Sequence, residues 1–161
     1  MSTVTAAVLA PPRTYRYAGG FITMLVTGEE TGGHFALMEA LQRPGAEPPL
    51  HIHKDACEMF HVIEGVIDIY IDGVIRRLGP GETALVPRGT PHTFRIRTDY
   101  VRGLVGLTPA GFEEWFTTAG IPTSDYDLPD HVEPMDERAM RLMAEMAPRL
   151  HLTVLPDRIE F

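Results

Sequence analysis

The pattern of hydrophobic and polar residues divides this chain into two regions. Up to about residue 107, short runs of β-branched and aromatic residues alternate with turn sequences, as in residues 13–26 and 33–42. The clearest turn is Asp72-Gly73, because both residues readily adopt positive φ and β-type segments flank them. Strand-sized runs separated by turns every eight to twelve residues or so predict an all-β barrel or sandwich.

The last third of the chain has helical periodicity instead. We expect a first helix from Pro109 to Ala119, capped by Thr108 and ended by Gly120. Its apolar face belongs either to the hydrophobic core or to a lid over the barrel mouth. That face consists of Phe112, Trp115, Phe116 and Ala119.

A second helix is predicted over residues 134–147, after a loop over residues 121–130, and both helices should dock on the barrel. Pro148 ends the second helix, and residues 151–155 form a terminal strand that could join the sheet edge of a partner. The apolar stripe of the second helix consists of Met135, Ala139, Leu142, Met143 and Met146.

Length and composition indicate an ordinary globular chain. With 161 residues we expect one domain over 1–161, with a barrel core at about 15–107 and a helical extension over 108–161. A net charge of −8 argues against nucleic-acid binding, and no apolar run has the roughly 18 residues of a membrane span. The start of the chain lacks the positive segment of a signal peptide, so we interpret it as a mobile arm. The single cysteine, Cys57, excludes an intrachain disulfide, and we expect a cytoplasmic location.

Three histidines and one glutamate are the strongest chemical signal. His51 and His53 are two residues apart, so on a strand they share a face, with Cα atoms roughly 6.6 Å apart. Two imidazoles at that separation can bind one ion, whereas on a helix they would point in different directions. Glu58 and His92 complete a set of three nitrogens and one oxygen. A single histidine is more often a core or surface residue, but the joint pattern favours a metal site.

The residues beside these ligands predict an apolar pocket. A period of two places Phe60 and Val62 on the face of Glu58, and Phe94 and Ile96 on the face of His92. If the ligands face the barrel interior, these four residues line the same cavity, which suits a small organic ligand. The remaining histidines are expected outside the site, with His61 pointing outward. Other open assignments concern Asp68 and Tyr70, which face either cavity or solvent, and Arg88, Arg95 and Arg97, which form a solvated face or a positive cluster.

The two segments that carry the ligands also have glycines and prolines at fixed spacings. They read GAEPPLHIHKDACEMFHVIEG, from Gly45 to Gly65, and GETALVPRGTPH, from Gly81 to His92. These segments resemble the two sequence motifs of the cupin superfamily, and the resemblance covers residues 35–107. One departure is Ile96, where the family often has asparagine. The resemblance implies a jelly-roll β-barrel with two C-terminal helices. It also implies one divalent transition metal, Fe, Ni, Mn, Co, Cu or Zn, bound by His51, His53, Glu58 and His92.

Within that superfamily, the chain is most similar to the small single-domain cupins related to quercetin 2,4-dioxygenases. The similarity rests on the complete ligand set, its apolar neighbours and the segment Pro-Ala-Gly-Phe-Glu-Glu-Trp-Phe. It implies a dioxygenase that cleaves a phenolic, flavonol-like or enediol substrate with O2, with Glu58 as both metal ligand and catalytic base. The implied substrate pocket consists of Phe60, Val62, Phe94, Ile96, Phe112, Trp115 and Phe116.

Two other functions remain open on the sequence alone. The same metal site could act as a Lewis acid in a redox-neutral isomerase, cyclase or decarboxylase. The protein could also be a small-molecule-binding cupin without catalytic activity. In either case we expect a small-molecule partner and a homodimer, because small cupins commonly pair through their sheets and Met59 and Ile63 present apolar side chains outward.

Overall fold

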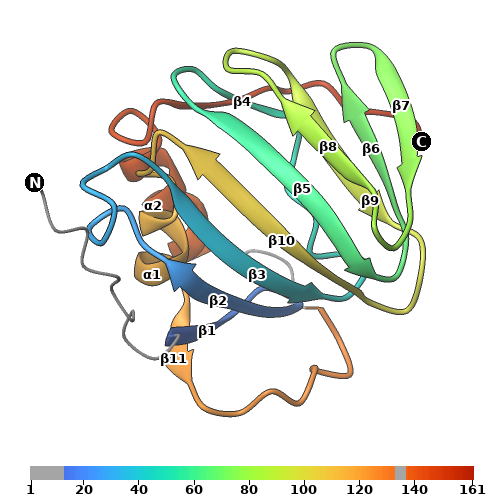
Figure 1. Cartoon of the computed structure of the whole chain (residues 1–161), viewed down its shortest axis with the longest axis horizontal. Coiled ribbons are helices and arrows are strands. Elements are labelled where there is room, and N and C mark those ends of the chain that lie inside the picture. The colour runs from blue at the N-terminus through green and yellow to red at the C-terminus, as the bar shows by residue number, and fades with distance from the viewer. Residues whose placement is uncertain (1–12, 133–136) are drawn as a thin grey trace, which may run out of the picture.

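Two antiparallel β-sheets face each other in the computed structural model, which describes residues 13–132 and 137–161 (Figure 1). In order across it, the seven-stranded sheet contains β11 (Ile121–Thr123), β1 (Arg13–Tyr17), β2 (Gly20–Val26), β3 (Ala36–Gln42), β10 (Val101–Thr108), β5 (Cys57–Glu64) and β8 (Thr83–Val86). The five-stranded sheet contains β12 (Leu152–Val154), β4 (His51–His53), β9 (His92–Ile96), β6 (Ile67–Ile71) and β7 (Val74–Leu78). The predicted all-β jelly roll is confirmed, although the two sheets do not close into a continuous barrel.

A period of two along the strands fills the space between the sheets. In β5, buried Glu58, Phe60 and Val62 alternate with half-buried neighbours. In β3, the buried side chains are those of every second residue from Ala36 to Gln42. Such alternation is typical of strands with one face on a core. The main core cluster draws on both sheets and contains Phe60, Val62, Ile67, Ile69, Leu78, Val86, Ile96 and Val101.

The first helix, α1 (Glu114–Ala119), is shorter than predicted. The expected start at Pro109 is wrong, because β10 continues through Thr108 and Gly111 has a φ of +139°, outside the helical region. The Ala110 N–H also donates to the Gly33 carbonyl oxygen instead of to a helical turn. The helix ends before Gly120, as the sequence predicts.

The structure differs from the predicted end of the chain in two short strands at the sheet edges. The expected loop over 121–130 is wrong at its start, because residues 121–123 form β11 and pair with β1. Pro122 lies opposite Tyr15 there, and an edge strand tolerates a proline. The terminal strand β12 pairs with β4 of the same chain and forms an edge of the five-stranded sheet. Both pairings join segments far apart in sequence, which local patterns do not reveal.

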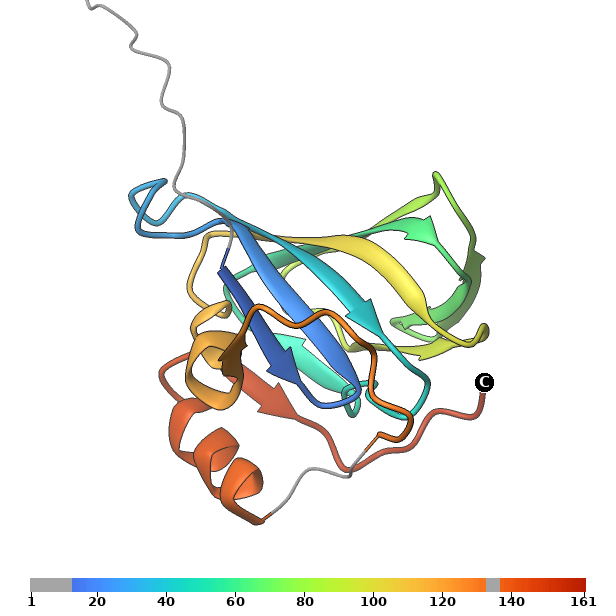
Figure 2. The ribbon, with the colours of Figure 1, turned by 90° about the horizontal axis from the view of Figure 1, so that it is seen from below.

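The second helix, α2 (Glu137–Met146), packs beside α1 at one end of the sandwich (Figure 2). Its predicted start, including Pro134 and Met135, lies outside the described residues, as does the predicted N-terminal arm. Trp115 is only 1% exposed, and its indole N–H donates to the Tyr17 hydroxyl over 2.8 Å. The two helices are joined to β12 by a cluster of buried residues, Trp115, Met146, Leu150 and Leu152. In the part of the chain that is described, no helix is long and apolar enough to cross a membrane.

Charged residues on the five-stranded sheet pair with one another. On the outer face of the sheet, Asp68 accepts hydrogen bonds from Arg77 and Arg97. These hydrogen bonds hold the pKa of Asp68 below its usual range. Arg95 and Arg97 also lie over the Phe161 ring, at 5.7 and 5.8 Å. Asp68 therefore faces away from the interior, and Arg97 belongs to an ion-paired surface.

Replacing Trp115 with alanine should reduce the free energy of unfolding by about 3–5 kcal/mol, because the change empties a buried site. Urea denaturation followed by circular dichroism measures this loss. Leu85→Ala is a suitable control, since Leu85 is 62% exposed, and it should change stability by less than about 0.5 kcal/mol. A loss at Trp115 no larger than at Leu85 would contradict its place in the core.

Candidate metal centre

The four predicted ligands come from both sheets and meet between them. His51 and His53 lie on the inner face of β4, and His51 is paired with His92, the first residue of β9. Glu58 reaches the same point from β5 in the opposite sheet. The four residues are between 1% and 6% exposed. The jelly roll thus brings together residues separated by up to 41 positions.

The distances within this cluster suit one ion. One candidate ligand atom from each residue lies within 4.8 Å of the others. The Oε2 atom of Glu58 is 2.8 Å from Nε2 of His92 and 3.2 Å from Nε2 of His53. Two ligand atoms at right angles, each about 2.1 Å from a metal, are about 3.0 Å apart. The cluster is therefore compatible with a single buried metal ion.

Backbone carbonyl groups fix the tautomers of two imidazoles. Nδ1 of His51 lies 2.9 Å from the Pro49 carbonyl oxygen, and Nδ1 of His92 lies 2.9 Å from that of Thr90. A carbonyl oxygen only accepts, so each Nδ1 must carry the proton and donate it. The Nε2 atom of each ring then faces the ligand cluster, where a metal would bind it, which is the usual orienting device at histidine sites.

His53 shows most directly that the residues fit a cation. Both of its ring nitrogens are buried and have no hydrogen-bond partner among the described residues. Its Nε2 is close to Glu58 but is not aligned for a hydrogen bond. Unpaired buried polar atoms are uncommon and costly. A metal bound at Nε2 would satisfy this ring and relieve the crowding of three imidazoles around one carboxylate.

Electrostatics keep the cluster in a metal-binding protonation state. Burial and the neighbouring His92 lower the pKa of His51 to about 4, so its imidazole is neutral at pH 7. Burial alone would raise the pKa of Glu58, but the adjacent His53 and His92 outweigh it and hold that pKa below its usual range. Metals bind neutral imidazole and ionised carboxylate, so neither group needs to lose a proton near neutral pH.

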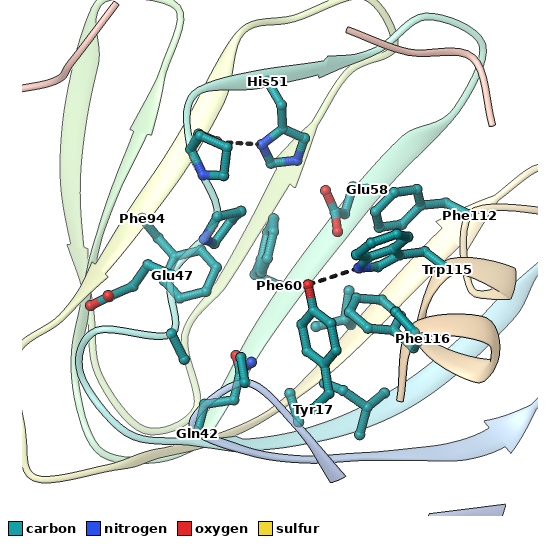
Figure 3. A pocket seen from close by; sticks show the side chains of 18 of the residues that line it. Tyr17, Gln42, Glu47, His51, Glu58, Phe60, Phe94, Phe112, Trp115 and Phe116 are labelled. Carbon is teal, nitrogen blue, oxygen red and sulfur yellow. Dashed lines mark hydrogen bonds between the residues drawn. The ribbon is translucent and has the colours of Figure 1, made fainter. Parts of the chain in front are cut away.

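The cluster borders a cavity of about 480 Å³ between the sheets (Figure 3). His51 and Glu58 form part of its wall. The predicted pocket residues that line it are Phe60, Val62, Phe94, Phe112, Trp115 and Phe116. Ile96 is the exception, because it is packed in the core cluster opposite Ile67 and is not part of the cavity wall.

The aromatic residues around α1 are both core and cavity wall. Trp115 is buried among the helices, whereas the Phe112 ring packs against His53 with 4.4 Å between ring centroids. A smaller pocket of about 300 Å³ lies on the other side of Phe112, next to His53, Asp55 and His151. Phe112 therefore lines both pockets, and the ligand His53 lines the smaller one.

Several residues that line the cavity were not predicted from the sequence to do so. They come from strands and helices outside the two motif segments, and a period of two on β3 was the available signal for two of them. These residues include Tyr17, Ile22, Ala40, Gln42, Val105, Leu142 and Met143. His61, by contrast, lies on the outer face of β5 as predicted, where its Nδ1 is 2.8 Å from the Thr83 hydroxyl.

Comparisons with known proteins place these observations in a family. A cupin-domain sequence profile matches residues 38–102. The chain is 31% identical to quercetin 2,3-dioxygenase of Bacillus subtilis over 118 residues, which cover 73% of this chain and 34% of that protein. It is also 31% identical to protein SchB of Streptomyces halstedii over 96 residues, or 59% of this chain and 68% of SchB. The chain thus spans only about a third of the length of the Bacillus relative.

Solved structures share the fold. An RmlC-like cupin from Shewanella frigidimarina superposes with a TM-score of 0.56 at 23% identity, covering 65% of this chain and 89% of that one. KdgF from a Halomonas species superposes with a TM-score of 0.54 at 18% identity, covering 60% and 84% of the two chains. At these identities the structures support the fold alone.

The role of His51 as a ligand can be tested by metal content. The wild-type protein should bind about one divalent ion per chain, and His51→Ala should weaken that binding at least about 100-fold while the β-sheet spectrum stays unchanged. Elemental analysis and isothermal titration provide the measurement. His61→Ala removes a histidine from the outer face and should bind metal normally. Equal metal binding by His51→Ala and the wild type would contradict the assignment.

Proposed function

Because the chain belongs to the cupin superfamily, we propose that it is a metal-dependent dioxygenase that cleaves a phenolic, flavonol-like or enediol small molecule with O2. The observation that carries this proposal is the buried set of three histidines and one glutamate at the wall of a largely apolar cavity. The similarity to a relative named quercetin 2,3-dioxygenase supports the choice of chemistry.

The cavity suits a planar organic molecule. Its volume of about 480 Å³ lies within the usual range of small-ligand sites. Phe60 and Phe94 pack together with ring centroids 5.7 Å apart, and Phe112 and Phe116 are 5.6 Å apart. These two aromatic pairs offer ring surfaces to an aromatic substrate and exclude water from it.

His51, His53, Glu58 and His92 would hold the metal ion and leave one or two coordination positions open. The ion, when bound, supplies a site at which a substrate oxygen is bound and activated toward O2. The three imidazoles are held in place by β4 and β9, so substrate binding would not need to reorganise them.

Glu58 is positioned to take the proton of a substrate hydroxyl, although, despite its burial, the neighbouring His53 and His92 keep its pKa low. It is the one carboxylate in the described ligand cluster, and its side chain borders the cavity. A substrate hydroxyl next to the metal would lie within hydrogen-bond reach of the carboxylate. Transfer of that proton to Glu58 leaves the anionic oxygen that reacts most readily with O2, and the acid formed can later return the proton to the product.

Oxygen consumption tests the reaction class. Metal-loaded protein mixed with a flavonol such as 3-hydroxyflavone should consume one O2 per substrate molecule, and both atoms of labelled O2 should appear in the products. An oxygen electrode and mass spectrometry make these measurements. Conversion of substrate without O2 uptake would contradict a dioxygenase and indicate redox-neutral Lewis-acid chemistry, and binding without conversion would indicate a binding protein.

Glu58→Gln separates the ligand role from the base role. The amide oxygen can still contact the metal but does not accept the substrate proton, so turnover should fall about 10²–10⁴-fold even at full metal occupancy. Glu145→Gln, on the exposed face of α2, is the matched control and should keep full activity. Turnover near the wild-type rate in fully metallated Glu58→Gln would rule out the base role.

A further inference from the structure

A buried amide lies on the wall of the metal-site cavity without a partner. The inner face of β3 carries Ala36, Met38, Ala40 and then Gln42, so one polar side chain follows three apolar ones. Gln42 is only 7% exposed. Its side-chain amide has no hydrogen-bond partner within residues 13–132 and 137–161. Among these residues, the fully enclosed unpaired polar atoms belong to Arg43 and His53 and not to Gln42, so the Gln42 amide faces the open cavity and is available to a ligand.

Gln42 lies far from the metal ligands within the same cavity. Along β10, Leu107 is opposite Glu58 and Val101 is opposite Gln42. These two residues of β10 are six positions apart, so Gln42 and Glu58 lie toward opposite ends of the strand. Figure 3 shows Gln42 and His51 on opposite sides of the cavity, with Phe60 between them. A ligand that binds at the ligand cluster therefore has to extend across the cavity to reach Gln42.

Glu47 and Arg16, two other polar residues that line the cavity, are already paired. The Glu47 carboxylate accepts hydrogen bonds from the N–H groups of Gly45 and Ile96, at 2.7 and 2.9 Å. Arg16 pairs with Asp125 at the surface. Arg138, at the exposed start of α2, also lines the cavity, but Gln42 offers an unpaired amide, which can both donate and accept and so matches a hydroxyl group.

Tyr17 adds a second polar atom between the two ends. Its hydroxyl accepts the Trp115 indole N–H, and its own proton has no acceptor in the described residues. Burial raises the pKa of Tyr17, so the phenol stays protonated and can donate to a ligand oxygen. Edge-on contacts with Trp115 and Phe116, at 6.0 and 5.2 Å between centroids, hold the ring in place (Figure 3).

We propose that Gln42 determines substrate specificity by hydrogen bonding to an oxygen at the end of the substrate remote from the metal. The substrate class is then an extended, multi-ring phenol with a hydroxyl on an outer ring, and a single-ring catechol or a small enediol would leave the amide unpaired. This inference rests on the proposed function, because it assumes that the metal-binding end of the substrate lies at Glu58. A site that hydrogen-bonds a substrate hydroxyl discriminates strongly against an analogue that lacks it.

The chain provides its own probe for the experiment. Trp115 is the single tryptophan and lines the cavity, so quenching of its fluorescence reports a bound ligand directly. Metal-loaded protein is titrated without oxygen, so that no turnover occurs, with 3-hydroxyflavone and with its 3,4′-dihydroxy and 3,7-dihydroxy analogues. These two analogues add one hydroxyl to either outer ring, which covers both orientations of the ligand.

The wild-type protein should bind at least one dihydroxy analogue about 2- to 12-fold more tightly than 3-hydroxyflavone, as expected for one added hydrogen bond. Gln42→Leu has a similar volume but no amide, so this ratio should fall to about one while 3-hydroxyflavone binds as well as before. Leu41→Ala, on the opposite face of β3, is the matched control and should keep the wild-type ratio. Metal content and circular dichroism should be unchanged in both variants.

The outcomes separate this inference from the dioxygenase proposal. Equal binding of all three flavonoids by the wild type, a preference that survives in Gln42→Leu, or no quenching by any of them would overturn the role of Gln42. Selective binding that depends on Gln42, in a protein that consumes no O2, would support the role of Gln42 and contradict the dioxygenase alone.

Discussion

The antiparallel pairing of His51 with His92 is the constraint on which the site depends. It places the short strand β4 against the start of β9, and the period of two then brings His53 to the same face. Glu58 faces them from the opposite sheet. Four buried ionisable groups in one place carry a large desolvation cost, which two backbone carbonyls and one carboxylate offset only in part. A bound cation explains such a cluster better than a contribution of the four residues to the stability of the fold does.

The sequence predicted the fold class and the shared face of His51 and His53 from local spacing, whereas Glu58 and His92 were assigned to the same site through the resemblance to the two cupin motifs. A period of two and the turn sequences define the strands, and the two-residue spacing of His51 and His53 defines their shared face. Features set by distant contacts were missed. The start of α1 depends on the backbone of Gly111, and β11 and β12 exist only through pairing with β1 and β4. Ile96 has the right period but lies too deep in the core to reach the cavity.

The cavity combines contributions that no single segment contains. The motif strands supply the ligands together with Phe60, Val62 and Phe94, and most of the apolar wall comes from β1, β2, β3, β10, β12 and the C-terminal helices. Trp115 links these parts, since it packs against α2 and β12, bonds to Tyr17 and faces the cavity. The sheets thus fix the metal ligands, while the elements outside the motifs shape the space available to the substrate. This division explains how one superfamily can keep a common site and differ in substrate.

The most direct test of the account is a crystal structure of the metal-loaded protein with anomalous diffraction measured at the absorption edge of the bound metal. The account predicts one anomalous peak per chain, about 2.0–2.3 Å from the Nε2 atoms of His51, His53 and His92 and from a carboxylate oxygen of Glu58. A peak held by other residues, or imidazoles that point away from a common centre, would contradict it.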